Sequence, residues 1–235
     1  MKKKIMLFCI FMLALPLKVS AHDVWMEKKD GYLVVEYGHP GETGSYDVSK
    51  VKEVEVYGTD GKVIQSVIKK DGYPVIIQPK GKAALVSLFF DNGFWIKTGD
   101  GWENKSKKEL PGTDESFSFY SLKYSKTLLE WCNKFSKPLG TDDLELVPLK
   151  NPLTAKAGDI LPLKIFLYGK PAEGVLINTG GYHKDDVRTD KNGFAEIQIE
   201  ETGFQIITAS VKIPLEDNTD ADILSLSANI TFEVP

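Results

Sequence analysis

The side chains with the most distinctive chemistry are three histidines, His22, His39 and His183. No two of them have the close helical spacing of a metalloprotease or zinc-finger motif. Imidazole nitrogen suits Ni²⁺, Co²⁺ and Cu²⁺ better than Mg²⁺ or Ca²⁺, so a transition-metal site is the first hypothesis. The competing interpretation is that each histidine is an ordinary solvated polar residue.

His22 is of interest because of the segment that precedes it. In residues 1–21, three lysines follow Met1, an apolar run extends from Ile5 to Leu17, and the segment ends in Val19-Ser20-Ala21. This pattern predicts a cleaved secretory signal, since the run is too short to span a membrane. Cleavage after Ala21 would give His22 a free α-amino group, which can close a chelate ring on one metal ion together with the imidazole. A frayed, solvated terminus is the alternative.

The other two histidines lie in turn-like contexts. His39 is flanked by Gly38 and Pro40, which force a turn at the end of an expected strand and can fix the direction of an imidazole. Glu42 could orient that ring. His183 lies in a polar loop whose lysine repels a cation and whose two aspartates attract one. For both histidines a polar turn residue remains the alternative.

Net charge, cysteine content and the motifs present limit the classes of function that this protein can have. Without residues 1–21 the chain has 214 residues, and its basic side chains fall from 29 to 25 against 33 acidic ones, a formal charge of −8. Nucleic acid and anionic membranes are poor partners for such a surface, whereas cations are better ones. The one remaining cysteine, Cys132, allows neither an intrachain disulfide nor a thiolate cluster. We find no phosphate loop, nucleophile elbow or suitably spaced carboxylate pair, so we expect no enzyme.

Short apolar runs between frequent turn signals predict the fold. The runs are rich in Val, Ile, Leu, Tyr and Phe, which favours an all-β protein of two tandem β-sandwich domains, immunoglobulin-like or prealbumin-like, with at most one short helix. Residues 121–135 fit either that helix or a strand. The turn signals are Asp30-Gly31, Asp60-Gly61, Asp71-Gly72, Asn92-Gly93, Asp100-Gly101 and Asn192-Gly193.

A stiff connector at Pro148–Pro152 suggests the division of the chain. We predict a signal peptide at 1–21, an N-terminal β-sandwich at 22–147 and a C-terminal prealbumin-like β-sandwich at 148–235. Aromatic residues gather at Phe94-Trp95 and Trp102, where they could bind sugars or simply fill a core.

Several stretches, in a fixed order, resemble a known family. That family of exported bacterial proteins typically opens Ala-His-Asp-x-Trp and is catalogued as a domain of unknown function. The matching stretches are Ala21-His22-Asp23-Val24-Trp25, Tyr37-Gly38-His39, Trp95–Thr98 with Gly101-Trp102, Lys123-Tyr124-Ser125-Lys126, Leu139-Gly140 with Leu144–Pro148 and Asn151-Pro152, and Thr189–Gly193.

The resemblance implies an extracytoplasmic sandwich protein that accompanies energy-coupling-factor nickel/cobalt uptake systems. It implies metal ligands at His22 and His39, and it does not extend that role to His183. The family often places a histidine in a late strand where this chain has Ala209-Ser210-Val211-Lys212. That departure puts a full imidazole site in question.

We therefore expect a soluble periplasmic protein that binds Ni²⁺ or Co²⁺ as cargo for a membrane transporter component, with His22, His39 and His183 as candidate ligands. Cu²⁺ is a further possible ion. The second hypothesis is a copper histidine-brace oxidative enzyme, with Tyr182 as an axial aromatic group. The third is a non-metal surface interaction or adhesion module, in which every histidine is dispensable.

Overall fold

The structure is a computed structural model, and it describes residues 22–110, 112, 116–179 and 184–235. The predicted signal segment, Tyr182 and His183 lie outside the described residues. In the part of the chain that is described, no helix is long and apolar enough to cross a membrane.

The described residues form strands and short 3₁₀ helices, so the predicted all-β class is confirmed. The 3₁₀ helices are η1 Val48–Lys50, η2 Lys107–Glu109, η3 Asn133–Ser136 and η4 Pro152–Thr154. The strands are β1 Asp23–Lys29, β2 Tyr32–His39, β3 Glu42–Thr43, β4 Val51–Gly58, β5 Val63–Ile64, β6 Ser66–Lys69, β7 Ile76–Pro79, β8 Ala83–Thr98, β9 Gly101–Glu103, β10 Ser118–Leu128, β11 Leu144–Pro148, β12 Ile160–Leu167, β13 Lys170–Pro171, β14 Leu176–Thr179, β15 Lys184–Arg188, β16 Phe194–Gln198, β17 Gly203–Pro214 and β18 Ile223–Val234.

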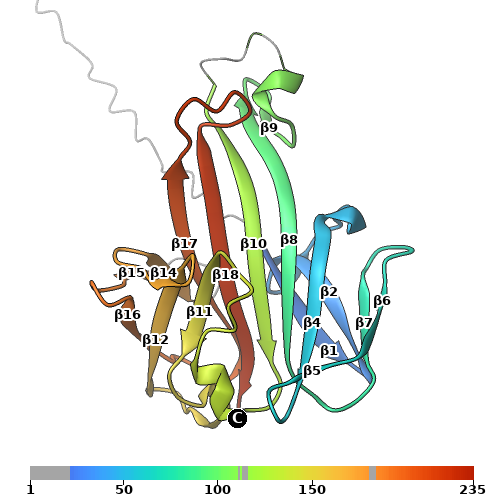
Figure 1. Cartoon of the computed structure of the whole chain (residues 1–235), viewed down its shortest axis with the longest axis vertical. Coiled ribbons are helices and arrows are strands. Elements are labelled where there is room, and N and C mark those ends of the chain that lie inside the picture. Colours follow the sequence, from blue (N-terminus) through green and yellow to red (C-terminus); the bar gives the residue numbers. More distant parts are fainter. Residues whose placement is uncertain (1–21, 111, 113–115, 180–183) are drawn as a thin grey trace, which may run out of the picture.

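Three sheets build the molecule. The central sheet has the order β15-β14-β17-β18-β10-β8-β4-β5, with β9 paired to β8. A second sheet has the order β1-β2-β7-β6 with β3 on β2, and a third has β11-β12-β13 with β16 on β12. In Figure 1 the long strands β8, β10, β17 and β18 rise above both small sheets, which flank their lower halves. We call the rising part of these strands the arm.

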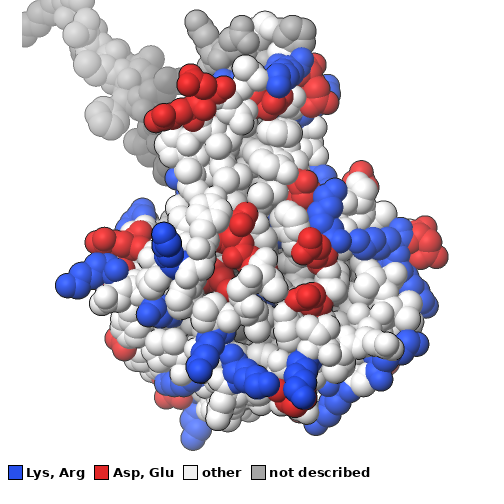
Figure 2. Space-filling model, viewed as in Figure 1, with Lys and Arg blue, Asp and Glu red and all other residues white. Residues whose placement is uncertain are grey.

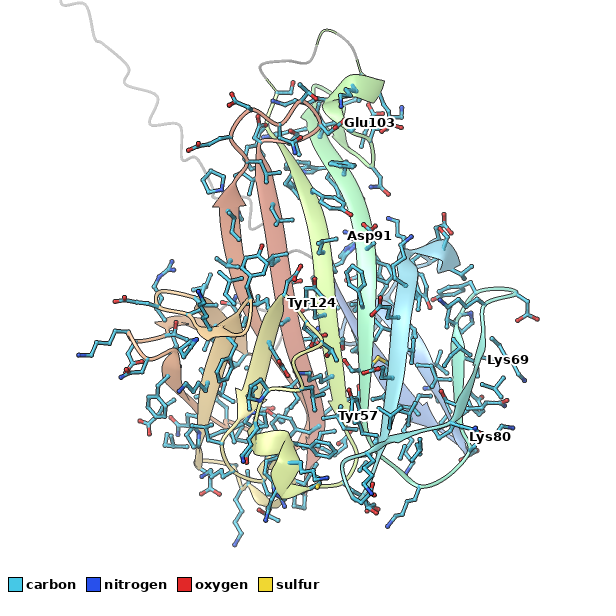
Figure 3. The ribbon with its side chains drawn as sticks, in the orientation of Figure 1. Tyr57, Lys69, Lys80, Asp91, Glu103 and Tyr124 are labelled. Atoms are coloured by element: carbon cyan, nitrogen blue, oxygen red, sulfur yellow. The ribbon has the colours of Figure 1, made fainter. Side chains whose placement is uncertain are left out.

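The two small sheets contact opposite faces of the central sheet. Strand β10 reaches both of them, because neighbouring side chains along a strand point to opposite sides. On β10, Thr127 donates a hydrogen bond to the carbonyl of Met26 in β1. From the other face, Tyr124 (labelled in Figure 3) donates to Asp143, just before β11, at 3.0 Å. Strand β10 is therefore the shared middle layer of two sandwiches.

Each interface has its own apolar core, and burial of these side chains provides the main driving force for folding. Toward β1 and β2 the core includes Val24, Met26, Val35, Leu88 and Phe90, all 1% exposed or less. The larger core toward β11 and β12 combines branched aliphatic side chains with aromatic rings and alanines, drawn from both halves of the chain. In Figure 2 the visible face of the arm carries few charges between its tip and the sandwiches.

Strand β18 joins the two predicted domains into one sheet. It pairs in parallel with β10 from Phe119↔Ile223 to Thr127↔Thr231, although β10 belongs to the predicted N-terminal domain and β18 to the C-terminal one. The predicted boundary is therefore crossed by the hydrogen bonds of the central sheet. Whether the two parts fold alone stays a prediction.

For two sequence patterns, the structure differs from the prediction or decides between its alternatives. Residues 121–135, which fit a helix or a strand, form most of β10 and then the short η3. The pattern at Asn92-Gly93 does not make a hairpin, because it lies inside β8, where the register against β10 shifts at Ser121/Leu122. Gly93 has φ +79°, so a positive φ is used there for a bulge within a long strand instead of a turn.

Candidate metal centre

Antiparallel pairing brings two of the three predicted ligands together. The register of β1 and β2 ends at Asp23↔Gly38, so His22 and His39 occupy the next opposed positions. Their ring centroids are 5.1 Å apart, with an interplanar angle of 74°. His183 lies outside the described residues, so its place relative to this pair stays open.

The turn after β2 holds His39 at a fixed position. Gly38 has φ +137°, and a Cβ atom there would meet the carbonyl oxygen of Glu42 at 2.5 Å. This close approach lets β3 fold back onto β2, with His39 paired to Glu42. Gly38 is therefore required both by its backbone conformation and by the space around it.

Aromatic side chains pack against the His22 ring. The ring of Tyr37 meets the His22 ring edge-on at a centroid distance of 5.1 Å and an angle of 87°. Tyr37 itself stacks on the fully buried Phe90 at 5.5 Å. The His22 ring thus packs against Tyr37, which is itself held by Phe90, and this contact limits the rotation of the His22 ring.

Hydrogen bonds fasten β1 to the central sheet. Asn229 of β18 donates its Nδ2 to the carbonyl of Val24 at 2.8 Å and accepts from Ser125 of β10 at 2.7 Å. Thr127 Oγ1 donates to the carbonyl of Met26 at 3.0 Å. Toward the N-terminal ends of β1 and β10, the same alignment of the two strands places Lys123 beside the end of β1 that carries Asp23.

Asp23 and Lys123 are two buried ionisable side chains at that end, and each influences the other electrostatically. They are 8% and 6% exposed, respectively. Burial raises the pKa of Asp23, against the lowering effects of the Lys123 charge and a hydrogen bond from Thr208, whose Oγ1 lies 3.3 Å from Oδ1. Burial lowers the pKa of Lys123, and the Asp23 charge opposes that shift.

The electrostatics of the site favour neutral imidazole. The pKa of His22 is lowered first by burial and then by the nearby His39 and Lys123. A neutral ring keeps a lone pair for coordination, whereas a protonated ring has none. His22 therefore stays in the form that binds metals at neutral pH.

The separation of the two rings fits one shared ion. With metal–nitrogen bonds of about 2 Å, two imidazoles on one ion at a roughly tetrahedral angle have centroids about 5 Å apart. Within the described residues, no three side chains of His, Cys, Asp or Glu gather closely enough to hold a metal. The pair can thus supply two nitrogen ligands.

Asp23 and Lys123 were missed as members of the site during sequence analysis. Both stand in stretches that resemble the known family, next to His22 and in Lys123-Tyr124-Ser125-Lys126. A charged residue amid apolar neighbours in a strand was the available signal, because its burial demands a partner. The identity of that partner depends on the packing of β1 on β10.

We predict that Gly38→Ala disrupts the site more than Gly41→Ala does. Both glycines have positive φ, but an added Cβ at Gly41 meets nothing within 4 Å. Gly41→Ala should cost about 1–2 kcal/mol of unfolding free energy from backbone strain alone. Gly38→Ala should cost more, since the added Cβ conflicts with the Glu42 carbonyl and moves the turn that carries His39.

Urea unfolding of both variants tests this prediction. Equal losses of stability for Gly38→Ala and Gly41→Ala would contradict it, because the two substitutions share the strain and differ in the steric conflict.

The fold and the paired histidines define an all-β protein with a candidate metal centre at the open end of its first described strand. Residues 19–213 match the family described as Domain of unknown function (DUF4198), and the chain belongs to that family. No match was found among curated proteins.

A solved structure that matches this chain is the Bacteroides ovatus mixed-linkage glucan utilization locus protein SGBP-B in complex with a mixed-linkage heptasaccharide. Its sequence is 9% identical and the TM-score is 0.18, with 88% of this chain and 45% of that chain covered. The chain thus spans less than half the length of that protein, and a TM-score this low carries no argument about fold or ligand.

Proposed function

We propose that this protein binds Ni²⁺ or Co²⁺ outside the cytoplasm and presents the ion to a membrane transporter. The observation that supports this best is the 5.1 Å separation of the His22 and His39 rings. Their positions in sequence are far enough apart that only the pairing of β1 with β2 could bring them together.

The donor chemistry agrees with such a cargo. Cleavage after Ala21 adds the α-amino nitrogen of His22 to the two imidazoles, which makes three nitrogen donors. Nitrogen donors suit Ni²⁺, Co²⁺ and Cu²⁺ and discriminate against Mg²⁺ and Ca²⁺. A site with three protein ligands leaves coordination positions open, through which a transporter can take over the ion.

A copper enzyme is the second candidate, because the same nitrogen set suits Cu²⁺ and an aromatic group, Tyr37, lies against His22. Copper-dependent consumption of peroxide separates this candidate from a carrier. Tyr182, the axial group considered from sequence, lies outside the described residues.

The test is a calorimetric titration of the secreted, processed protein with Ni²⁺, Co²⁺ and Cu²⁺. An intact mass first establishes that the chain begins at His22. The matched control carries one extra glycine before His22, which moves the amine away from the imidazole. We expect one ion per chain and a loss of affinity of at least about tenfold in the control.

Absence of binding for all three ions would overturn the metal proposal and favour an interaction module. Tight binding that the extra glycine leaves unchanged would show that the α-amino group is not a ligand.

A further inference from the structure

Neighbouring strands of the second sheet carry side chains with metal-binding chemistry in a single row. His22 lies just before β1, His39 ends β2 and Glu42 begins β3, and β2 pairs with both of these strands. Glu42 is the register partner of His39, and His22 occupies the next opposed position on the β1 side. Opposed residues of an antiparallel pair point to the same side of the sheet, with Cβ atoms about 4.5–5.5 Å apart. One face at this end of the sheet therefore presents two imidazoles and a carboxylate.

The backbone of Glu42 is held close to β2, whereas its side chain can turn. A Cβ atom at Gly38 would meet the Glu42 carbonyl oxygen at 2.5 Å, so the two strands approach more closely than a side chain there would allow. Glu42 is exposed, and among the described residues none engages its carboxylate in a hydrogen bond or an ion pair. The three side chains are not gathered at ligand distance in the structure, so the carboxylate reaches an ion by rotation of its own side chain.

Asp23, the other carboxylate that is close to a histidine in the sequence, points elsewhere. It is one position along β1 from His22, and neighbouring side chains of a strand face opposite sides. Its Oδ1 lies 3.3 Å from the Thr208 hydroxyl of β17. Glu42 is thus the carboxylate that shares a face with both imidazoles.

A carboxylate would change both the charge and the geometry of the bound ion. Imidazole and amine nitrogens are neutral donors, so an ion bound by them alone keeps its full double charge, which a carboxylate at bonding distance partly offsets. Side chains from one sheet face approach the ion from one side and leave positions open on the other. Two imidazoles and a carboxylate in this arrangement suit an octahedral divalent ion, whereas Cu²⁺ prefers a planar or tetragonal set of donors.

We propose that Glu42 is the third side-chain ligand of the ion and that it raises the affinity for Ni²⁺ and Co²⁺ relative to Cu²⁺. This inference rests on the proposed metal-binding function and adds one ligand to its three nitrogen donors. Ni²⁺ and Co²⁺ are held by the two imidazoles, the α-amino nitrogen and the carboxylate. Cu²⁺ is held by the three nitrogens in one plane, without Glu42.

The experiment compares Glu42→Gln with Glu36→Gln in calorimetric titrations of the secreted, processed protein with Ni²⁺ and with Cu²⁺. Glu36 is the matched control, because it lies on β2 and loses the same charge, but stands three residues before His39 and so points to the other face. The visible absorption of bound Co²⁺ is a second readout, since it depends on the number and type of ligands. Thermal unfolding without metal checks that both variants fold.

We expect Glu42→Gln to lower the ratio of Ni²⁺ to Cu²⁺ affinity by at least about tenfold, through weaker Ni²⁺ binding, and to change the Co²⁺ spectrum. Glu36→Gln should keep both affinities within about threefold of wild type, because a charge on the far face contributes little. An equal loss of Ni²⁺ and Cu²⁺ affinity in Glu42→Gln would overturn the proposal, since it would indicate attraction by charge without a bond to the ion. Unchanged Ni²⁺ affinity would overturn it as well.

Failure of the proposed function gives a different result. The unmodified protein would then bind none of these ions, and both the function and the role of Glu42 would be rejected. An unmodified protein that binds Ni²⁺, together with a Glu42→Gln variant that binds it equally well, would leave the proposed function standing and would reject only the carboxylate ligand.

Discussion

Replacement of Lys126 by methionine is expected to lower the free energy of unfolding by about 3–5 kcal/mol, because it leaves buried carboxylates without their counter-charge. The side chains of Lys126, Asp142 and Glu145 are 6%, 5% and 2% exposed. Lys126 is hydrogen-bonded to Glu145, and its Nζ lies 3.4 Å from Asp142. Methionine fills a similar volume, so the loss reports on charge and not on packing.

Glu145 links this ion pair to the backbone of a neighbouring segment. Its carboxylate also accepts hydrogen bonds from the backbone amides of Leu139 and Gly140, at 2.5 and 3.1 Å. The network therefore ties β10 to the segment that leads into β11. Lys126 of the central sheet thus helps to hold the third sheet in place through Glu145.

Chemical denaturation of Lys126→Met, Glu145→Gln and the double variant measures the coupling. Glutamine removes the charge and keeps an acceptor for one of the two amides, so the double variant should be more stable than Lys126→Met alone. Burial already raises the pKa of Asp142, against the Lys126 charge. A carboxyl whose pKa is raised in the folded state stabilises the fold as pH falls, so the deficit of Lys126→Met should shrink on acidification. Additive effects of the two substitutions would contradict a coupled pair.

On the proposed metal-binding function, replacement of His39 by alanine is expected to lower the affinity for Ni²⁺ by at least about 100-fold, since it removes one of the two imidazoles. Stability should change little, because His39 stands at the end of β2 and not in either core. The loss of affinity would then be separable from a loss of fold.

Calorimetry with Ni²⁺ on His39→Ala, together with thermal unfolding, checks this expectation. Thr43→Ala is the matched control, because Thr43 lies in the adjoining β3, is exposed and pairs with Gly38. Wild-type affinity in His39→Ala would exclude His39 from the ligand set and would leave the proximity of the two rings as packing only.

The sequence predicts the local features of this protein well, since they depend on short-range rules. Alternation of apolar residues in Ile160–Leu167 became β12, with Leu161, Leu163 and Ile165 fully buried. The turn at His39 also follows from its glycines and proline. These features need only the residues on either side of them.

The features that escaped prediction depend on which strands meet across the molecule. Nothing near Ile223–Val234 specifies a parallel partner in β10, so the sharing of one sheet by both halves could not be inferred. Lys123 and Lys126 looked alike in the sequence, yet the pleat sends them to opposite faces of the central sheet, where Lys126 pairs with Glu145 and Asp142. Their roles become distinct only when β1 and β11 have packed on either side of β10.

Strand β18 also docks the hairpin that carries the histidine pair. Asn229 in β18 bonds to Val24 across 205 positions of chain and to Ser125 across 104. Contacts of such long range close slowly, because much of the chain must be ordered before they form. A nascent polypeptide without β18 lacks both the middle of its main sheet and the side chain that docks β1. The hairpin that carries the two histidines is therefore docked on the central sheet only after residues 223–234 have been synthesised.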